Sequence, residues 1–192
     1  MAEEDLKNQI KAKEEKIRNI EEEALKKVAI VEKEIEEQFD PKIKQLEDKV
    51  AKEQTILAEA VKNYEELKES VKKSKNAVKT IVKSIKSEID EESIDDVKIK
   101  EMESKLESEK SNLGKVLADH EEWKIKYKDS KKRVKNLNKE IKSFKKEKDK
   151  ELSLRSKEIS NDKKTELKPV KAELKELQKE LSVLEKTSTS EL

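Results

Sequence analysis

The stretch that decides the fold is residues 43–85, which reads IKQLEDKVAKEQTILAEAVKNYEELKESVKKSKNAVKTIVKSI. Every seventh residue of this stretch is apolar or aromatic, and residues 99–144 repeat the pattern. Heptad spacing of this kind places one narrow apolar stripe on a helix, which is buried against a second helix in a coiled coil. The first series is Ile43, Val50, Leu57, Tyr64, Val71, Val78 and Ile85, and the second is Ile99, Leu106, Leu113, His120, Tyr127, Val134 and Ile141.

The heptad changes phase once on each side of the chain. Val31 and Ile43 are 12 residues apart (43 − 31), which is one heptad plus five residues. Lys148 and Leu167 are 19 residues apart (167 − 148), which is two heptads plus five residues. Equal shifts are expected if the two helices run antiparallel and shift at the same height. The residue numbers of facing positions then add to a constant, which we take as about 187; values of about 180 and 194 keep the same heptad phase. A parallel dimer of straight helices is the alternative arrangement.

We therefore predict an all-α, rod-shaped, antiparallel coiled-coil hairpin with two arms of about 90 residues. Arm one covers 3–89 with a break at 40–41, the bend covers 90–95, arm two covers 96–186, and 187–192 form a frayed tail. Asp40-Pro41 is typical of an N-cap followed by a first helical residue and permits either a helix restart or a kink after Phe39, and Pro169 predicts a kink. Ser93 and Asp96 resemble a capping box at the start of arm two.

The composition excludes most enzyme and barrel folds. Charged residues make up 48% of the chain and hydrophobic residues 32%, with one Gly, two Pro, no Cys and a net charge of +1. One glycine cannot supply the turns of a β-barrel or a phosphate-binding loop, and one histidine without cysteine cannot form a zinc cluster. We expect no catalytic residues, no metal and no cofactor.

The predicted seam brings residues from both arms together. His120 occupies a seam position opposite Leu67, where it either packs or makes the seam sensitive to pH. The aromatic residues either fill the seam, with Tyr127 facing Ala60, or form a stacking platform for a partner. The selected seam residues are Tyr64, Trp123, Tyr127, Ile43, Phe144, Leu6 and Leu181.

Two regions are more apolar than a two-helix seam requires, one between residues 24 and 35 and one near the bend. A stripe wider than the seam implies a further helix that covers it. We expect hairpins to pair into a four-helix section, which makes the protein a homodimer. The predicted self-association stripe near the bend is Ala77, Val82, Ile89 and Leu117.

Residues 124–150 are strongly basic and could bind an anionic partner, either nucleic acid or a membrane surface. Acidic residues on the opposite arm, among them Glu53, lie at matching heights, so complementarity within the hairpin is the favoured explanation. The residues of this basic patch are Lys124, Lys126, Lys128, Lys131, Lys132, Arg133 and Lys135.

Hairpins of this length resemble the arms of SMC-type ATPases, and the architectural resemblance extends over the whole chain. The sequence has no nucleotide-binding head, glycine-rich hinge or Cys-x-x-Cys hook.

We expect a cytoplasmic, non-enzymatic scaffolding protein that acts as a rigid, self-associating spacer and docks other proteins at its bend or joined termini. The alternative is a protein that associates with nucleic acid or anionic membranes through residues 124–150. No apolar run is long enough to span a membrane, and the polar, acidic N-terminus is unlike a signal peptide.

Overall fold

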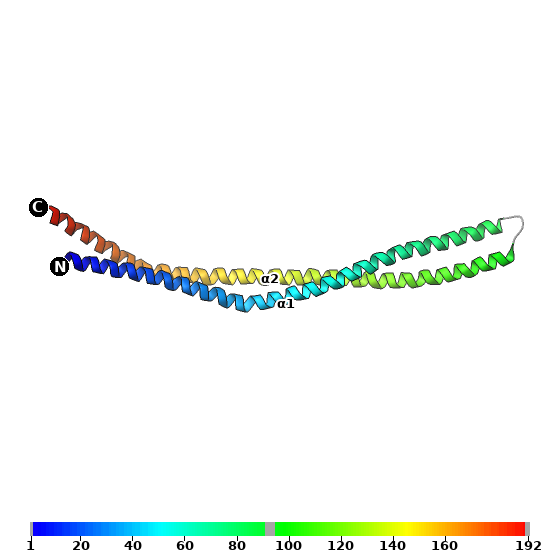
Figure 1. Ribbon diagram of the computed structural model, residues 1–192, viewed down its shortest axis with the longest axis horizontal. Coiled ribbons are helices and arrows are strands. Elements are labelled where there is room, and N and C mark those ends of the chain that lie inside the picture. Colours follow the sequence, from blue (N-terminus) through cyan, green and yellow to red (C-terminus); the bar gives the residue numbers. More distant parts are fainter. Residues whose placement is uncertain (1, 91–94, 191–192) are drawn as a thin grey trace. The chain divides into compact units, whose positions relative to one another are not determined.

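The computed structural model describes residues 2–90 and 95–190, and these form two long α-helices (Figure 1). Helix α1 spans Ala2–Ile89 and helix α2 spans Asp96–Ser190. The two helices are antiparallel, and the described ranges contain no strand. The predicted all-α antiparallel hairpin is therefore confirmed, while the four-helix section remains a prediction.

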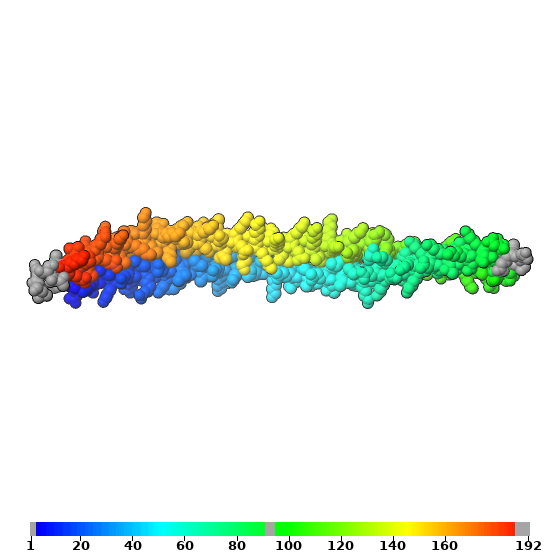
Figure 2. All heavy atoms as spheres, turned by 90° about the horizontal axis from the view of Figure 1, so that it is seen from above, coloured from blue at the N-terminus to red at the C-terminus, as the bar shows by residue number. Residues whose placement is uncertain are grey.

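The chain divides into two compact units, each of which is a pair of antiparallel helical segments. Unit 1 comprises Met1–Lys44 and Lys142–Leu192, and unit 2 comprises Gln45–Ile141. In unit 1 the blue segment of α1 lies directly against the yellow-to-red segment of α2 in both views (Figures 1 and 2). The apolar stripe of each segment is thus covered by the other segment of the same unit.

The core of each unit is the narrow seam between its two segments. From Ile35 to Val50 the buried residues follow one another at steps of three and four, and Leu167 and Val170 are three residues apart, as the heptad pattern requires. Residues in the remaining core positions of the heptads, such as Leu57 and Leu106, are half-buried because a two-helix seam leaves its edges open to water. The buried apolar residues are Ile35, Phe39, Ile43, Leu167 and Val170 in unit 1, and Leu46, Val50, Ala60, Val71 and Ile141 in unit 2.

Helix α1 passes through Pro41 without ending, so the predicted break at 40–41 is absent. Pro41 is exposed, and the carbonyl four residues earlier that loses its N–H partner can bind water instead. The seam crosses this region on the opposite side through Ile35, Phe39 and Ile43, which follow one another at steps of four. The five-residue phase shift is thus accommodated within a continuous helix.

Helix α2 likewise continues through Pro169, which is exposed between the buried residues Leu167 and Val170. It remains helical as far as Ser190, beyond the point where a frayed tail was expected to begin. Residues 191–192 of that tail lie outside the described part of the chain.

The N-cap of α2 is Asp95, where the sequence pattern suggested Ser93. The Oδ1 atom of Asp95 accepts hydrogen bonds from the backbone N–H groups of Val97 at 3.1 Å and Lys98 at 3.2 Å. These are donors of the first turn, which have no partner inside the helix. Ser93 itself lies outside the described residues.

Ion pairs between the two segments of each unit report the register. In unit 1, Arg155 Nη1 lies 3.1 Å from Glu34 Oε2 and Lys148 Nζ lies 2.5 Å from Asp40 Oδ1. In unit 2, Lys98 Nζ lies 2.5 Å from Glu88 Oε2. The residue numbers of these pairs add to about 187, which supports that register over the values one heptad away. Further pairs between the segments are Lys13–Glu173, Lys163–Glu21 and Lys7–Glu185 in unit 1 and Arg133–Glu53 in unit 2.

Candidate functional site

An aromatic stack occupies the seam in the middle of unit 2. The ring of Tyr64 lies between two rings of α2, with centroids 4.9 Å from His120 and 5.8 Å from Tyr127. His120 therefore contacts Tyr64, one turn away from the expected position opposite Leu67. Ring pairs of this geometry add about 0.5–1.5 kcal/mol each to the burial of their area. The stack thus ties α1 to α2 in the middle of unit 2, where Ala60 of α1 and Ser130 of α2 are buried.

The other selected seam residues lie where the two segments of each unit meet. Ile43 is buried, whereas Phe144, Leu6 and Leu181 are half-buried. Trp123 is also half-buried and carries the ammonium group of Lys126 4.3 Å from its ring centroid. This cation–π contact covers part of the indole face.

Polar residues also occupy the seam of unit 2. Ser130 is 2% exposed and Ser74 is 9% exposed, and these small side chains fit the seam. The Oε1 atom of Glu53 is buried and has no hydrogen-bond partner among the described residues. The Nε atom of Arg133 lies 3.8 Å from that oxygen. A polar residue at such a position weakens the seam but favours one register.

The predicted self-association stripe is divided between the two flanks of the seam. Val82, Ile89 and Leu117 occupy heptad position e, whereas Ala77 occupies position g on the other flank. Ala77 and Val82 are half-buried against the seam, but Ile89 is 50% exposed and Leu117 is 40% exposed. The structure therefore leaves Ile89 and Leu117 as the uncovered part of this stripe.

The basic patch is only partly neutralised by acidic groups. Lys124 and Lys126 pair with Glu121 and Glu122 of the same helix, at 2.8 Å and 2.7 Å. The hydrogen bond from Lys124 lowers the pKa of Glu121 below its ordinary value, and the same contact raises the pKa of Lys124. Three further members of the patch bear exposed ammonium groups for which the described residues offer no ion pair: Lys128, Lys132 and Lys135.

The remaining cation contacts of the patch are local. Lys131 donates a hydrogen bond of 3.2 Å to the hydroxyl of Tyr127 and lies 5.5 Å from that ring centroid. Arg133 reaches toward Glu53 of α1, so complementarity between the arms accounts for one member of the patch in unit 2.

Gly114 lies inside α2, where glycine destabilises a helix by about 1 kcal/mol relative to alanine. It is the only glycine of the sequence, and its φ is not positive. Apart from its chain neighbours and the nearby backbone of its own helix, a Cβ at this position would meet no atom of the described residues within 4 Å. The helix pair itself therefore does not require a glycine here, and sequence reasoning did not single this residue out.

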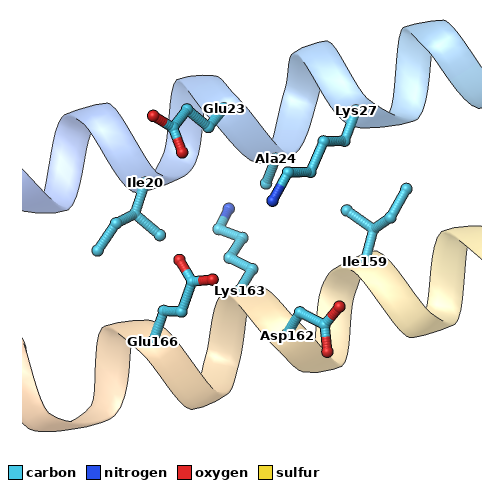
Figure 3. Close-up of a pocket in the computed structure, with 8 residues that line it drawn as sticks. All are labelled: Ile20, Glu23, Ala24, Lys27, Ile159, Asp162, Lys163 and Glu166. Carbon is cyan, nitrogen blue, oxygen red and sulfur yellow. The ribbon is translucent and has the colours of Figure 1, made fainter.

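A small cavity lies in the seam of unit 1, with a volume of about 10 Å³, roughly that of one water molecule (Figure 3). Ile20 and Ile159 flank it, and the side chains of Lys27 and Lys163 reach into the space between the helices.

The described residues hold no group of three or more His, Cys, Asp or Glu side chains placed to bind a metal ion. Within those same residues, neither helix has a segment that is long and apolar enough to cross a bilayer.

Comparison with known proteins gives one structural likeness. No protein-family model matches the chain, and no curated protein matches it. Among solved structures, the chain is similar to the crystal structure of a coiled-coil segment (residues 345–468 and 694–814) of Pyrococcus yayanosii Smc. The two share 19% identity with a TM-score of 0.31, over 97% of this chain and 85% of that chain.

Proposed function

We propose that this protein is a non-enzymatic structural coiled coil, a stiff spacer that self-associates and docks partner proteins at its bend or at its joined termini. The observation that carries the proposal is the seam: apolar side chains of α1 and α2 are used to hold each helix pair together in one register. A protein of this kind acts through the distance and orientation that it sets between attached partners.

The ends of the hairpin support the docking of partners. In unit 1, Lys7 of α1 and Glu185 of α2 lie 4.0 Å apart, so residues near the two ends of the hairpin lie side by side. At the bend, the described residues next to the turn are acidic or apolar and exposed, including Asp95, Asp96 and Val97. Exposed side chains at two separate places of this kind suit a protein that links two partners.

The hairpin arrangement is tested by crosslinking Leu6→Cys with Leu181→Cys in one chain. The chain contains no other cysteine, so every disulfide within one chain reports this pair. The proposal expects a link within one chain, which migrates as a monomer on a non-reducing gel. Links between two chains at dilute protein concentration overturn the hairpin and with it the spacer.

Stiffness is tested by measuring distances between spin labels on α1. Labels at Glu22→Cys and Glu65→Cys are separated by 43 residues, or about 65 Å along a straight helix. The matched control is Lys52→Cys with Lys83→Cys, which lies within unit 2. A stiff spacer gives distance distributions of similar width for both pairs. A several-fold broader distribution for the longer pair contradicts a rigid spacer.

A second candidate function is the binding of an anionic partner by the basic patch. The exposed ammonium groups of Lys128, Lys132 and Lys135 favour it, because the described residues offer them no ion pair. Binding of duplex DNA or acidic vesicles must then weaken steeply as salt rises, because the binding energy comes from released counterions. The triple substitution of these lysines by glutamine must remove the binding; binding that survives it excludes this site.

A further inference from the structure

The exposed side of α2 in unit 2 carries a second series of residues spaced at alternating steps of three and four. The central members are Lys110, Gly114, Leu117 and Glu121. All four are exposed, and Leu117 is 40% exposed, so the series runs outside the seam with α1. We call this series the outer stripe of α2; it continues to Glu103 at one end and Lys128 at the other. This spacing is the one by which a helix packs against another helix.

The outer stripe has an acidic half, a small apolar centre and a basic half. Glu103 and Glu107 precede Gly114, and Lys124 and Lys128 follow Leu117. When a second copy of the stripe is laid antiparallel, with the twofold axis between Gly114 and Leu117, each acidic residue faces a lysine. The facing pairs are Glu103 with Lys128, Glu107 with Lys124, Lys110 with Glu121 and Gly114 with Leu117, and each pair occurs twice by symmetry.

From this self-complementarity we infer that α2 carries a docking face for a second copy of this chain, which binds antiparallel along the outer stripe. The interface is isologous, so each copy contributes both halves. Leu117 of one copy packs over Gly114 of the other. The inference rests on the proposed function, because it names the surface through which the spacer self-associates.

Gly114 supplies an independent reason for this face. Nothing in the described helix pair requires glycine at this position, since its backbone is ordinary helix and the space beside its Cα is open. Glycine allows close approach of another backbone or side chain. In the proposed register, Leu117 of a second copy lies opposite Gly114 and can occupy that space. This packing removes an exposed large hydrophobic side chain from water.

The pattern also selects one register. A shift of one heptad in either direction places Leu117 against Glu121 or Glu107 of the second copy, where an apolar side chain desolvates a carboxylate. The proposed register has one unfavourable pair toward its ends, Lys100 with Lys131, and beyond it the favourable pair Asp96 with Lys135. The stripe between the Asp96–Lys135 pairs extends over about 58 Å of helix.

The first experiment measures the dimer dissociation constant of the full chain by sedimentation equilibrium. Glu103→Lys alone and Lys128→Glu alone each place like charges opposite one another twice, and we expect at least a tenfold weaker dimer for each. The two substitutions combined in one chain restore opposite charges and must restore dimerisation. The control combination, Glu103→Lys with Lys132→Glu, has the same net charge as the wild type but leaves Lys128 facing a lysine, and it must stay weak.

The second experiment tests the central contact and the register. Gly114→Met introduces a better helix former at this position, so the helix content must be retained while the dimer weakens at least tenfold. In mixtures of single-cysteine chains, a bismaleimide must link Glu103→Cys to Lys128→Cys efficiently. Linkage to Lys135→Cys, one heptad further on, must be several-fold lower.

Three results overturn the docking face. They are a mass of 22.4 kDa for the wild type at all concentrations up to 100 micromolar, failure of the combined charge reversal to restore a dimer, and unchanged dimerisation of Gly114→Met. A monomer that still forms the Leu6–Leu181 link within one chain overturns this face and leaves the spacer standing. Links between chains at Leu6 and Leu181 overturn the spacer instead.

Discussion

Replacing Ile35 by alanine tests whether the seam of unit 1 is where the structure places it. Ile35 is 1% exposed, and the matched control is Ile30, which is 57% exposed five residues earlier on the same helix. Both substitutions remove the same three carbon atoms from the same helix. The gain in helix propensity on going from isoleucine to alanine is therefore equal and cancels in the comparison.

The expected magnitudes follow from burial. Three buried carbons are worth about 2.4 kcal/mol at about 0.8 kcal/mol each, and the cavity left behind raises the loss at a buried site to about 2–4 kcal/mol. In the folded protein less than half of Ile30 is buried, since the residue is 57% exposed. After the substitution, water fills the space left by the missing atoms. That loss is about 1 kcal/mol before the propensity gain, which is about 0.4 kcal/mol. We expect Ile35→Ala to lose about 2 kcal/mol more than Ile30→Ala.

The assay is urea unfolding followed by far-ultraviolet circular dichroism, with the free energy of unfolding extrapolated to water. The slope against urea must be the same in both variants, so that the change in midpoint reports stability alone. Losses that agree within about 0.5 kcal/mol would refute the reasoning, because two positions with such different burial would then be equivalent.

Three further predictions concern the aromatic stack, an ion pair and the cap. Tyr64→Leu is expected to lose about 1–2 kcal/mol of unfolding free energy, because both ring contacts disappear; a double-mutant cycle with His120→Ala that shows no coupling contradicts the stack. The hydrogen bond from Lys13 lowers the pKa of Glu173 in the folded protein. The pair therefore stabilises the fold at pH values above the unfolded pKa of this carboxylate. That stabilisation is lost as the pH falls through the lower folded pKa. Lys13→Met must raise the pKa of Glu173 toward its ordinary value of 4.5 in an NMR titration, and an unchanged value speaks against the pair. Asp95→Ala must lose about 1 kcal/mol and Asp95→Asn only a small part of that, by urea unfolding; equal losses would show that the side-chain oxygen is not the cap.

Several features of the fold could be predicted because they depend on periodicity alone. The spacing of residues 43–85 placed Ile43 and Val50 in the seam, and both are buried. The equal phase shifts in the two arms predicted antiparallel pairing with a sum of about 180, 187 or 194, and the Glu34–Arg155 pair supports 187. Both inferences need only the geometry of a helix and the requirement that apolar positions face one another.

Other features escaped sequence reasoning because they depend on which side of a helix a residue faces. Pro41 was expected to break α1, but it faces solvent, where water can bind the carbonyl that it leaves without a partner. Asp95 and Ser93 are both residue types that cap helices, and the hydrogen bonds from the first turn of α2 identify Asp95 as the cap. Ala77 and Val82 looked equivalent in a count of apolar residues, yet they lie on opposite flanks of the seam.

By itself, the sequence determined that the chain forms two long helices that pair through one stripe, because the heptad repeat fixes which residues must leave water together. The tertiary structure decided how that stripe is completed at short range: Tyr64 lies between His120 and Tyr127, and Lys126 covers the ring of Trp123. It also revealed that the side of Gly114 is open. These details depend on side-chain rotamers and on the approach of the second helix, which a one-dimensional repeat does not encode.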